Sequence, residues 1–437
     1  MTSDRRKRVA VIGSGISGLS AAWLLCRAHD VTVYEQGPRL GGHSRTVEAA
    51  GVPVDMGFIV YNEATYPNLV ALFRHLGVET RESSMSFSAS IDGGRLEYAG
   101  TDLRGLLAQP LNALRPRFWS MLRDLRRFYR DARHDAAALG RDLISLDSYL
   151  ARERYGPAFV RDHLLPMAAA IWSTPAATVG AYPAAAFLRF CENHGLLQLR
   201  DRPAWRTVVG GSHAYVQKLS AAFADRIRLG CGVVAIRRTD DAVLVRATDG
   251  SLERYDDVVI ATHAPQALAM LEDASDSERA LLGVLRTAPN RVVLHRDPSF
   301  MPRRKAAWAS WNYLGQPDGA LCVTYWMDML QGLPTTTGQH FVTLNPTSEP
   351  SLILHEESFA HPQFDAAAIR AQRALWSLQG TRRTWYCGAW FGAGFHEDGL
   401  QAGLAVAEQL GGVRRPWSVS AESARIHVPV PAGLAAA

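Results

Sequence analysis

The stretch that most constrains this chain runs from Val9 to Leu25 and reads VAVIGSGISGLSAAWLL. Its apolar start predicts a buried strand, its glycines predict a tight turn, and the apolar continuation predicts a helix. Gly13, Gly15 and Gly18 have the G-x-G-x-x-G spacing. In that spacing the first glycine allows the turn, the second admits a pyrophosphate, and the third lets helix and strand pack closely. The stretch therefore predicts a dinucleotide-binding unit.

A second predicted strand, VTVYE, ends at Glu35, whose carboxylate can accept both hydroxyls of an adenosine ribose. The N terminus of the intervening helix offers free N–H groups and a positive dipole end to the phosphates. The alternative is a glycine-rich loop that merely packs a helix on a sheet. The strand, turn, helix, second strand and acid all occur in the expected order, which disfavours this alternative. The predicted nucleotide contacts in this unit are Gly13, Ser14, Gly15, Ile16, Ser17, Gly18, Glu35 and Gln36.

The continuation after the acid favours FAD over NAD. A free NAD site needs nothing in particular there, whereas this chain continues QGPRLGGHSRTVEAAGVPVDMGFIVYN. The continuation resembles the E-x-x-x-R-x-G-G-R and D-x-G pattern of the monoamine oxidase and phytoene desaturase superfamily of flavoproteins. The matching residues are Arg39, Gly41, Gly42, His43, Asp55, Gly57 and Phe58.

This resemblance implies FAD as the cofactor and gives these residues roles. Arg39 and the glycine pair would close over the pyrophosphate from its second side. Gly57 and Phe58 would run beside the isoalloxazine ring. The sequence departs from the common pattern at His43, where amine oxidases usually carry arginine.

A middle stretch resembles the superfamily's return to the FAD domain. A glycine pair precedes a predicted helix over residues 213–223, and three strands follow with a hairpin turn at Asp249-Gly250. Val233 matches the position whose backbone meets the adenine edge. The run VVIAT leads into a predicted turn at residues 263–265, so that Thr262 and Pro265 would pass the phosphates and the ribityl chain.

The last motif, WFGAGFHEDGLQAGLAVAEQL, follows a predicted strand that ends at Gly388. Gly399 opens a helix whose N terminus would point at the flavin, where a positive helix end stabilises the negative charge of the reduced ring. Glu397 and Asp398 lie in its first turn and oppose flavin reduction, so we expect one of them to bind ribityl or backbone groups. The resemblance implies cofactor contacts at Gly388, Asp398, Gly399 and Leu400.

The three FAD stretches span the chain, which at 437 residues is long enough for more than one domain. The expected fold class is α/β, with a discontinuous Rossmann-type FAD-binding domain and an inserted mixed α+β substrate domain, as in amine oxidases. The predicted FAD-binding segments are 1–65, 204–274 and 384–415. The predicted substrate segments are 66–203 and 275–383. Residues 416–437 would form a tail whose end we expect to be disordered.

The inserted segments are predicted to supply the substrate side. Residues 66–200 are expected to be mostly helical, with apolar side chains that line a pocket or fill a core. These are Met167, Ile171, Trp172, Phe187 and Phe190. Strands are predicted in RVVLHRD, AAWASWNYL, ALCVTYWMDML and FVTLNP. Their aromatic residues would form a pocket wall or pack a sheet on helices. These are Trp308, Trp311, Tyr313, Tyr325 and Trp326.

One basic region, residues 111–133, is predicted to be an amphipathic helix, because its apolar residues recur every three or four positions. They are Leu111, Leu114, Phe118, Met121, Leu125 and Phe128, and arginines supply much of the remainder. We favour a helix that covers the core of the substrate domain and leaves its basic face in water. The alternative is peripheral contact with an anionic membrane.

Composition limits the other partners. The net charge of +5 is mild, and no basic cluster interleaved with stacking aromatics suggests nucleic acid. No apolar run approaches the ~20 residues of a membrane span, and no signal segment precedes the first strand. The five cysteines have neither C-x-x-C nor metal spacing. We therefore expect no metal site and a cytoplasmic location, with membrane-peripheral contact left open.

Several segments resemble a narrower group. DMGFIVYN, LPMAAAIWS, SWNYL, VTYWMDMLQGL and WFGAGFHEDGL are similar to bacterial amine-oxidase-like proteins that resemble the flavin domain of plant cyclopropane fatty-acid synthases. They also resemble flavoenzymes that desaturate or isomerise fatty-acyl chains. Only one dinucleotide fingerprint is present, so the organic substrate is expected to reduce the flavin by hydride transfer to N5. Oxygen or a quinone would be the later acceptor, or the hydride would return in an isomerisation.

The favoured hypothesis is thus an FAD-dependent oxidoreductase that acts on a small apolar molecule, a fatty-acyl or lipid chain. A flavin-dependent amine oxidase is the second, although none of the three lysines matches the flavin-facing lysine of amine oxidases. A non-catalytic flavoprotein partner of a lipid-modifying enzyme is the third. The candidates for proton handling or substrate orientation are His396, Glu397 and Tyr313.

Overall fold

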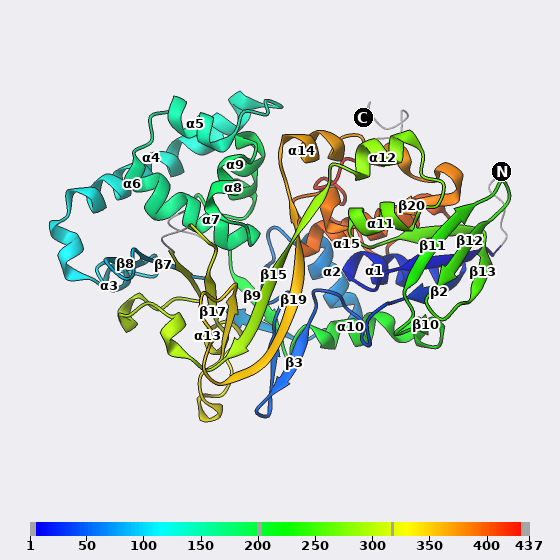
Figure 1. The fold of residues 1–437 in the computed structure, drawn as a ribbon, viewed down its shortest axis with the longest axis horizontal. Coiled ribbons are helices and arrows are strands. Elements are labelled where there is room, and N and C mark those ends of the chain that lie inside the picture. The colour runs from blue at the N-terminus through cyan, green and yellow to red at the C-terminus, as the bar shows by residue number, and fades with distance from the viewer. Residues whose placement is uncertain (1–5, 199–202, 316–318, 430–437) are drawn as a thin grey trace.

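A computed structural model describes residues 6–198, 203–315 and 319–429. A parallel five-stranded sheet organises one end of the molecule (Figure 1), with the strand order β10-β2-β1-β14-β20. Its strands are β1 (Arg8–Ile12), β2 (Asp30–Tyr34), β10 (Ile227–Arg228), β14 (Asp257–Ile260) and β20 (Thr384–Tyr386). Apolar residues such as Val9, Val11 and Val259 are wholly buried in it, as expected for a parallel sheet covered on both faces.

Helix α1 (Ile16–Leu25) packs on this sheet, and helix α15 (His396–Leu410) packs on α1. Their close approach requires glycine. A Cβ atom at Gly403 would lie 2.2 Å from the Ser17 carbonyl oxygen, and one at Gly399 would lie 2.8 Å from Ser17 Oγ. The first helix after the glycine turn is therefore held by the last helix of the chain.

The middle of the chain supplies a small antiparallel sheet and flanking helices. Strands β11 (Val233–Arg238), β12 (Val243–Ala247) and β13 (Leu252–Tyr255) confirm the three strands and the hairpin at Asp249-Gly250. Helix α10 (His213–Ser220) gives way to a 3₁₀ turn over 221–226, earlier than the predicted end at residue 223. Helix α11 (Ala264–Met270) begins where a turn was predicted, because Pro265 fits the first helical turn.

A seven-stranded mixed sheet forms the other end, in the order β19-β15-β18-β17-β16-β7-β8. Figure 1 shows its two long strands, β15 and β19, running side by side toward the end that holds the five-stranded sheet. The strands are β7 (Phe87–Ile91), β8 (Leu96–Ala99), β15 (Arg286–His295), β16 (Trp311–Leu314), β17 (Val323–Trp326), β18 (Phe341–Leu344) and β19 (Ile353–Gln363).

Helices lie above this sheet in Figure 1, and α4 and α9 pack on each other there. They are α4 (Pro116–Leu139), α5 (Leu146–Arg152), α6 (Pro157–Phe159), α7 (Leu165–Trp172), α8 (Ala176–Gly180) and α9 (Ala184–Asn193). The remaining helices are α2 (Pro67–Leu76), α3 (Leu103–Leu106), α12 (Asp276–Leu282), α13 (Met327–Gln331) and α14 (Ala366–Gln372). The remaining strands are β3 (Thr46–Ala49), β4 (Val52–Asp55), β5 (Tyr61–Asn62), β6 (Thr80–Ser83) and β9 (Trp205–Val208).

The structure departs from the predicted secondary structure in three places. The segment expected to be mostly helical also contains strands β6, β7 and β8, and the hairpin between β7 and β8 turns at Asp92, Gly93 and Gly94, all with positive φ. The MDML segment is helix α13 rather than strand, and it ends at Gly332 in the left-handed conformation. Strand β19 was not predicted at all, because ILHEESFAHPQ is polar and contains a proline.

The basic amphipathic helix begins later than predicted. Arg115 precedes Pro116 and is extended, with φ −94° and ψ 113°, because a residue before proline avoids helical angles. Leu111 and Leu114 therefore lie in a separate 3₁₀ turn, 60% and 79% exposed. Of the predicted apolar face, Phe118, Met121 and Phe128 are buried, whereas Leu125 is half-buried.

The strands of the five-stranded sheet come from the three segments predicted for the FAD-binding domain, and those of the seven-stranded sheet come from the two substrate segments. A further sheet, β5-β9-β6, joins the two sets. In the tail, Trp417 stacks on Trp23 at 5.8 Å and Ile426 is buried, whereas the predicted disordered end, 430–437, lies outside the described residues. No helix within the described ranges is long and apolar enough to cross a bilayer.

Candidate active site

A cavity of about 1700 Å³ runs from the glycine turn after β1 to helices α4 and α9. Most residues predicted to contact the cofactor line it. They are Gly13, Ser14, Gly15, Ile16, Ser17, Glu35, Gln36, Arg39, Gly41, Gly42, His43, Gly57, Phe58, Val233, Thr262 and Gly388. The fold thus brings together residues from all three predicted FAD-binding segments.

The nucleotide end is built on Glu35. Its carboxylate accepts hydrogen bonds from the backbone N–H of Ser14 at 3.0 Å and of Gly37 at 2.8 Å, and from the Ser14 hydroxyl at 2.5 Å. Gly13 has a φ of +99°, which L side chains rarely adopt. The turn and the acid at the end of β2 are therefore locked to each other.

The pyrophosphate position fits an anion. A Cβ atom at Gly15 would meet nothing within 4 Å, and Gly15 begins α1 with no side-chain cap. The helix N terminus is thus open to a negatively charged group. Gly42 approaches from the second loop, since its Cβ would lie 3.2 Å from Gly15 Cα. The two glycine segments therefore meet directly, beside the open helix N terminus at which a pyrophosphate would lie.

Five predicted cofactor contacts do not line the cavity. Gly18 serves packing, because a Cβ there would lie 2.0 Å from the Gly13 carbonyl oxygen. Gly399 packs α15 on α1, and Leu400 is fully buried. Pro265 lies in the first turn of α11. Asp398 accepts a hydrogen bond from the Phe395 N–H at 2.8 Å.

Glu357, on β19, balances two cavity arginines. Its carboxylate lies 2.7 Å from a guanidinium nitrogen of Arg39 and 2.7 Å from one of Arg45. Burial raises the pKa of Glu357, but the hydrogen bonds from both arginines outweigh burial and hold it below its ordinary value. Arg39 also donates to the Gly42 carbonyl at 3.1 Å, which ties it to the second glycine loop.

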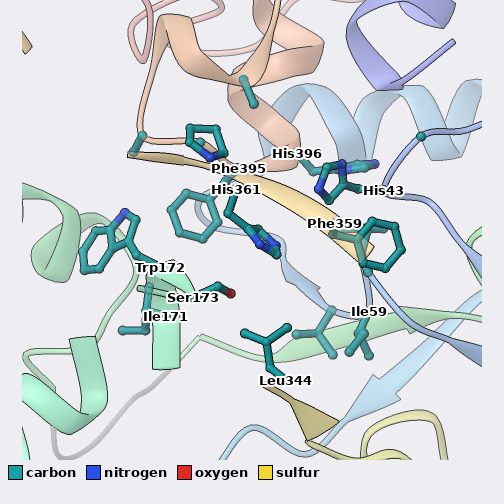
Figure 2. Close-up of a pocket in the computed structure, with 18 of the residues that line it drawn as sticks. His43, Ile59, Ile171, Trp172, Ser173, Leu344, Phe359, His361, Phe395 and His396 are labelled. Carbon is teal, nitrogen blue, oxygen red and sulfur yellow. The ribbon is translucent and has the colours of Figure 1, made fainter. Parts of the chain in front are cut away.

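Six of the described histidines line the cavity, and four of them are His43, His263, His361 and His396. The ring of His43 lies 5.4 Å from that of His361 and 5.9 Å from that of His263. Figure 2 shows His43 near His396, with His361 on the strand that crosses the cavity. Burial lowers the pKa of His361 to about 4 and that of His396 to about 3, and it holds the pKa of His43 well below its ordinary value. These rings are neutral at pH 7.

The hydrogen bonds of His361 fix which nitrogen carries its proton. Asn290 Nδ2 donates to His361 Nδ1 at 2.8 Å, and Asn345 Nδ2 donates to Asn290 Oδ1 at 2.7 Å. Since Nδ1 accepts and the ring is neutral, the hydrogen lies on Nε2. His361 thus offers a hydrogen-bond donor at the cavity. His43 Nε2 is buried with no hydrogen-bond partner among the described residues, which leaves a polar atom for a bound group.

Of the three predicted catalytic candidates, only His396 lines the cavity. Its ring stacks on Phe58 at 3.8 Å, and its Nε2 lies 2.6 Å from the Tyr215 hydroxyl. Glu397 points away, and it accepts backbone hydrogen bonds from Asn68 and Leu69 at 3.0 Å each. This confirms that an acid of this turn binds backbone groups.

Tyr313, the third candidate, lies in the core and is 5% exposed. Its strand nevertheless contributes Trp311 to the cavity, and the paired residue Tyr325 joins it there. The predicted aromatic wall therefore exists in part, because Trp308 and Trp326 pack on each other at 5.4 Å and do not line the cavity.

The end of the cavity farther from the glycine turn is mostly apolar. Four of the five apolar residues named from the helical segment line this end, and Phe187 does not, because it is wholly buried in the core. The apolar lining includes Met85, Phe87, Leu106, Leu122, Leu125, Met167, Ile171, Trp172, Phe190 and Leu344.

Helix α4 contributes one stripe to this end: Leu122, Leu125, Arg126 and Tyr129. Arg126 is exposed and, among the described residues, has no ion pair or hydrogen bond. The neighbouring arginines do have partners. These pairs are Arg123 and Arg127 with Asp124, Arg130 with Asp131, and Arg133 with Glu192. An uncompensated cation thus lies where an apolar cavity meets solvent.

Sequence reasoning missed Glu357, Phe359 and His361, which all lie on β19. A signal was present, because these three residues are spaced by two, which is the period of a strand, and Glu356 on the other face pairs with Arg291. The residues that line the cavity are histidine and glutamate, however, so hydrophobic alternation could not reveal it. Within the described ranges, no group of histidine, cysteine and acidic residues is suited to hold a metal ion.

Comparison with known proteins agrees with the cofactor site that the cavity geometry indicates. The family model for flavin-containing amine oxidoreductases matches residues 16–348 of this chain. The chain belongs to this family. It is accordingly an FAD-dependent oxidoreductase, and its cofactor is FAD.

Individual relatives vary in activity. A Mycobacterium tuberculosis protein assigned as the flavin-containing monoamine oxidase AofH is 30% identical over 254 residues, which cover 56% of this chain and 54% of AofH. Coproporphyrinogen III oxidase of Mycobacterium bovis is 25% identical over 305 residues, which cover 65% of each chain. The chain thus matches between about half and two thirds of the length of these curated relatives.

Solved structures share the fold. Putrescine oxidase bound to putrescine has a TM-score of 0.69 at 15% identity, covering 93% of this chain and 99% of that one. A fatty acid isomerase from P. acnes that produces CLA has a TM-score of 0.65 at 16% identity, covering 94% and 99%. At such identities the likeness shows the fold of this family alone. These relatives do not bear on the resemblance to cyclopropane fatty-acid synthases, which stays a prediction.

Proposed function

We propose that this family member desaturates or isomerises a long apolar chain with an anionic end, such as a fatty acid. The observation that carries the proposal is Arg126, a cation without a partner among the described residues, at the mostly apolar end of the cavity. An arginine can bind a carboxylate through two parallel hydrogen bonds. The apolar wall would hold the hydrocarbon chain between Arg126 and the flavin.

The carboxylates of the cavity favour this substrate over an amine. Three acidic side chains line it, and each has partners already: Glu35 binds Ser14 and Gly37, Asp102 caps α3, and Glu357 pairs with two arginines. An ammonium group taken from water needs a free opposite charge. No lysine lines the cavity within the described ranges.

The residues that would hold FAD are part of the same proposal. We infer that the cavity-lining residues between Gly13 and Ser17, with Glu35 and Val233, hold the nucleotide. Arg39 and His43 would lie along the second side. The segments 1–65, 204–274 and 384–415 would then form the FAD-binding domain, with 66–203 and 275–383 forming the substrate domain. When bound, FAD supplies the hydride acceptor at flavin N5.

The protein would orient the substrate chain, exclude water from the site and supply neutral polar groups. His361 holds a proton at Nε2, and His396 is held against Phe58 and Tyr215. Because burial keeps the pKa of both imidazoles low, they remain uncharged beside the chain at pH 7. An apolar C–H group can lie there without displacing water from a fixed ion.

Amine oxidation is the second candidate, and one observation favours it. Figure 2 shows the aromatic side chains of Trp172, Phe359 and Phe395 at the cavity around His361. Aromatic faces attract cations, so this group could surround an amine. Two of the relatives above carry amine oxidase names, whereas another is a fatty acid isomerase.

The test compares Arg126→Gln with a matched control, Arg123→Gln, on the same helix. The KM for a free fatty acid should rise by at least about tenfold in R126Q, because a charge-assisted pair is lost. The KM for the corresponding methyl ester should not change, and R123Q should resemble the wild type with both. Equal KM values for the acid in R126Q and the wild type would contradict the proposal.

A further inference from the structure

Four large apolar side chains are exposed beside the cavity. Leu103, Leu111, Leu114 and Trp119 are 72%, 60%, 79% and 54% exposed. They belong to one short segment that links α3 to the start of α4, and we call these four side chains the apolar lip. In Figure 1 this segment forms the end of the molecule opposite the N terminus. Large exposed apolar side chains that gather on one segment, unlike single ones, mark an interaction site.

The lip continues into the mouth of the cavity. Trp119, Leu122 and Arg126 are spaced by three and four residues, so they lie on one face of α4. Leu122 and Arg126 line the cavity. On the other side, Leu103 is flanked by Asp102 and Leu106, which line it too. Other exposed leucines, such as Leu252 and Leu352, do not adjoin the cavity.

The lip is held in place rather than loose. The Trp119 indole N–H donates to the Ala113 carbonyl at 2.8 Å. Asn112 is wholly buried and donates to the Glu97 carbonyl at 3.0 Å. Leu111 and Leu114 are three residues apart in a 3₁₀ turn, so they project from the same side. The fold thus holds Trp119 and the turn around Asn112 in place while these apolar side chains face water.

The positive charge around the lip favours an anionic partner. Residues 103–123 contain four arginines and no acidic residue. Arg104 is exposed and has no ion pair or hydrogen bond among the described residues, and the Arg123 side chain is 75% exposed. Leucine and tryptophan side chains framed by arginines match the boundary between the head groups and acyl chains of an anionic lipid bilayer.

We propose that the apolar lip docks this protein on an anionic lipid surface, with the cavity mouth facing the bilayer. The four side chains insert at the head-group boundary, and the nearby arginines meet the lipid phosphates. The docking itself needs no turnover. The further step, in which an acyl chain passes from the bilayer past Leu122 and Arg126, rests on the proposed function.

The experiment measures flotation of the FAD-loaded protein with vesicles of phosphatidylcholine alone, or with roughly one third phosphatidylglycerol. The wild type should float with the anionic vesicles and far less with the neutral ones. The double variant Leu111→Gln, Leu114→Gln should reduce partitioning by at least about tenfold. The matched control Leu252→Gln, Leu352→Gln removes two leucines of similar exposure elsewhere and should bind as the wild type does.

Three results would overturn the inference. One is a wild type that binds neither vesicle. Another is binding that the lip variant retains in full, which would mean that charge alone drives it. The third is self-association of the wild type without lipid that the lip variant abolishes, which would make the lip a protein interface. Because flavin content and flotation are read without substrate, a failure of the proposed reaction would leave the docking result standing.

Discussion

At the scale of single residues, the site depends on polar groups whose charge is decided by burial. Glu357 stays ionised because Arg39 and Arg45 meet it. His361 and His396 stay neutral because burial lowers their pKa values to about 4 and about 3. The same physics acts away from the cavity at His295. It is wholly buried, its Nε2 lies 2.7 Å from the Thr343 hydroxyl, and burial lowers its pKa to about 4.

His295 gives a prediction on pH and stability. The unfolded chain binds a proton at this residue below pH about 6.5, and the folded chain binds it only near pH 4, so acid favours unfolding between those values. The free energy of unfolding should fall as pH is lowered through this window, with His295 contributing at most about 1.4 kcal/mol per pH unit. Urea unfolding of His295→Gln should show a shallower fall than the wild type. Parallel curves would refute the assignment.

At the scale of elements, the contact between α1 and α15 decides whether the glycine turn keeps its place. Gly403 lies inside α15, where alanine would ordinarily stabilise a helix by about 1 kcal/mol. Here its Cβ would lie 2.2 Å from the Ser17 carbonyl and 2.3 Å from Ser20 Oγ. Both contacts belong to α1, so the methyl group would push the two helices apart.

Gly403→Ala should therefore destabilise the protein by roughly 1–3 kcal/mol, as overpacking does. It should also weaken FAD retention, because α1 presents its N terminus to the pyrophosphate. Thermal unfolding and flavin content after gel filtration measure both effects. The sign is decisive, since a stabilised variant would mean that the two helices do not pack closely.

The elements also show which parts of the fold could be predicted from the sequence. The unit from β1 to β2 and the strands from β11 to β14 were predictable, because glycine spacing and apolar runs reflect local backbone geometry and burial. Strand β19 was not, because its stability comes from pairing with β15 and its cavity residues are polar. The exposed turn before α4 was missed because the apolar period continues through Pro116, although proline ends it.

At the scale of the whole molecule, one cavity links the cofactor cradle to a mouth flanked by Arg126 and the apolar lip. The family supplies the cofactor and the class of reaction, while the choice of substrate depends on the substrate end of this cavity. That end offers hydrocarbon contacts and a free cation, and its acids already have partners. The organic chain that reaches the flavin therefore decides the reaction.

The most direct measurement mixes the FAD-loaded protein, without oxygen, with two chains of equal length, oleic acid and oleylamine. The visible flavin absorbance and the products are followed over one turnover. We predict that the acid either bleaches the flavin or acquires a new or shifted double bond, and that the amine does neither. Bleaching by the amine, with the acid recovered unchanged, would contradict the account and support an amine oxidase.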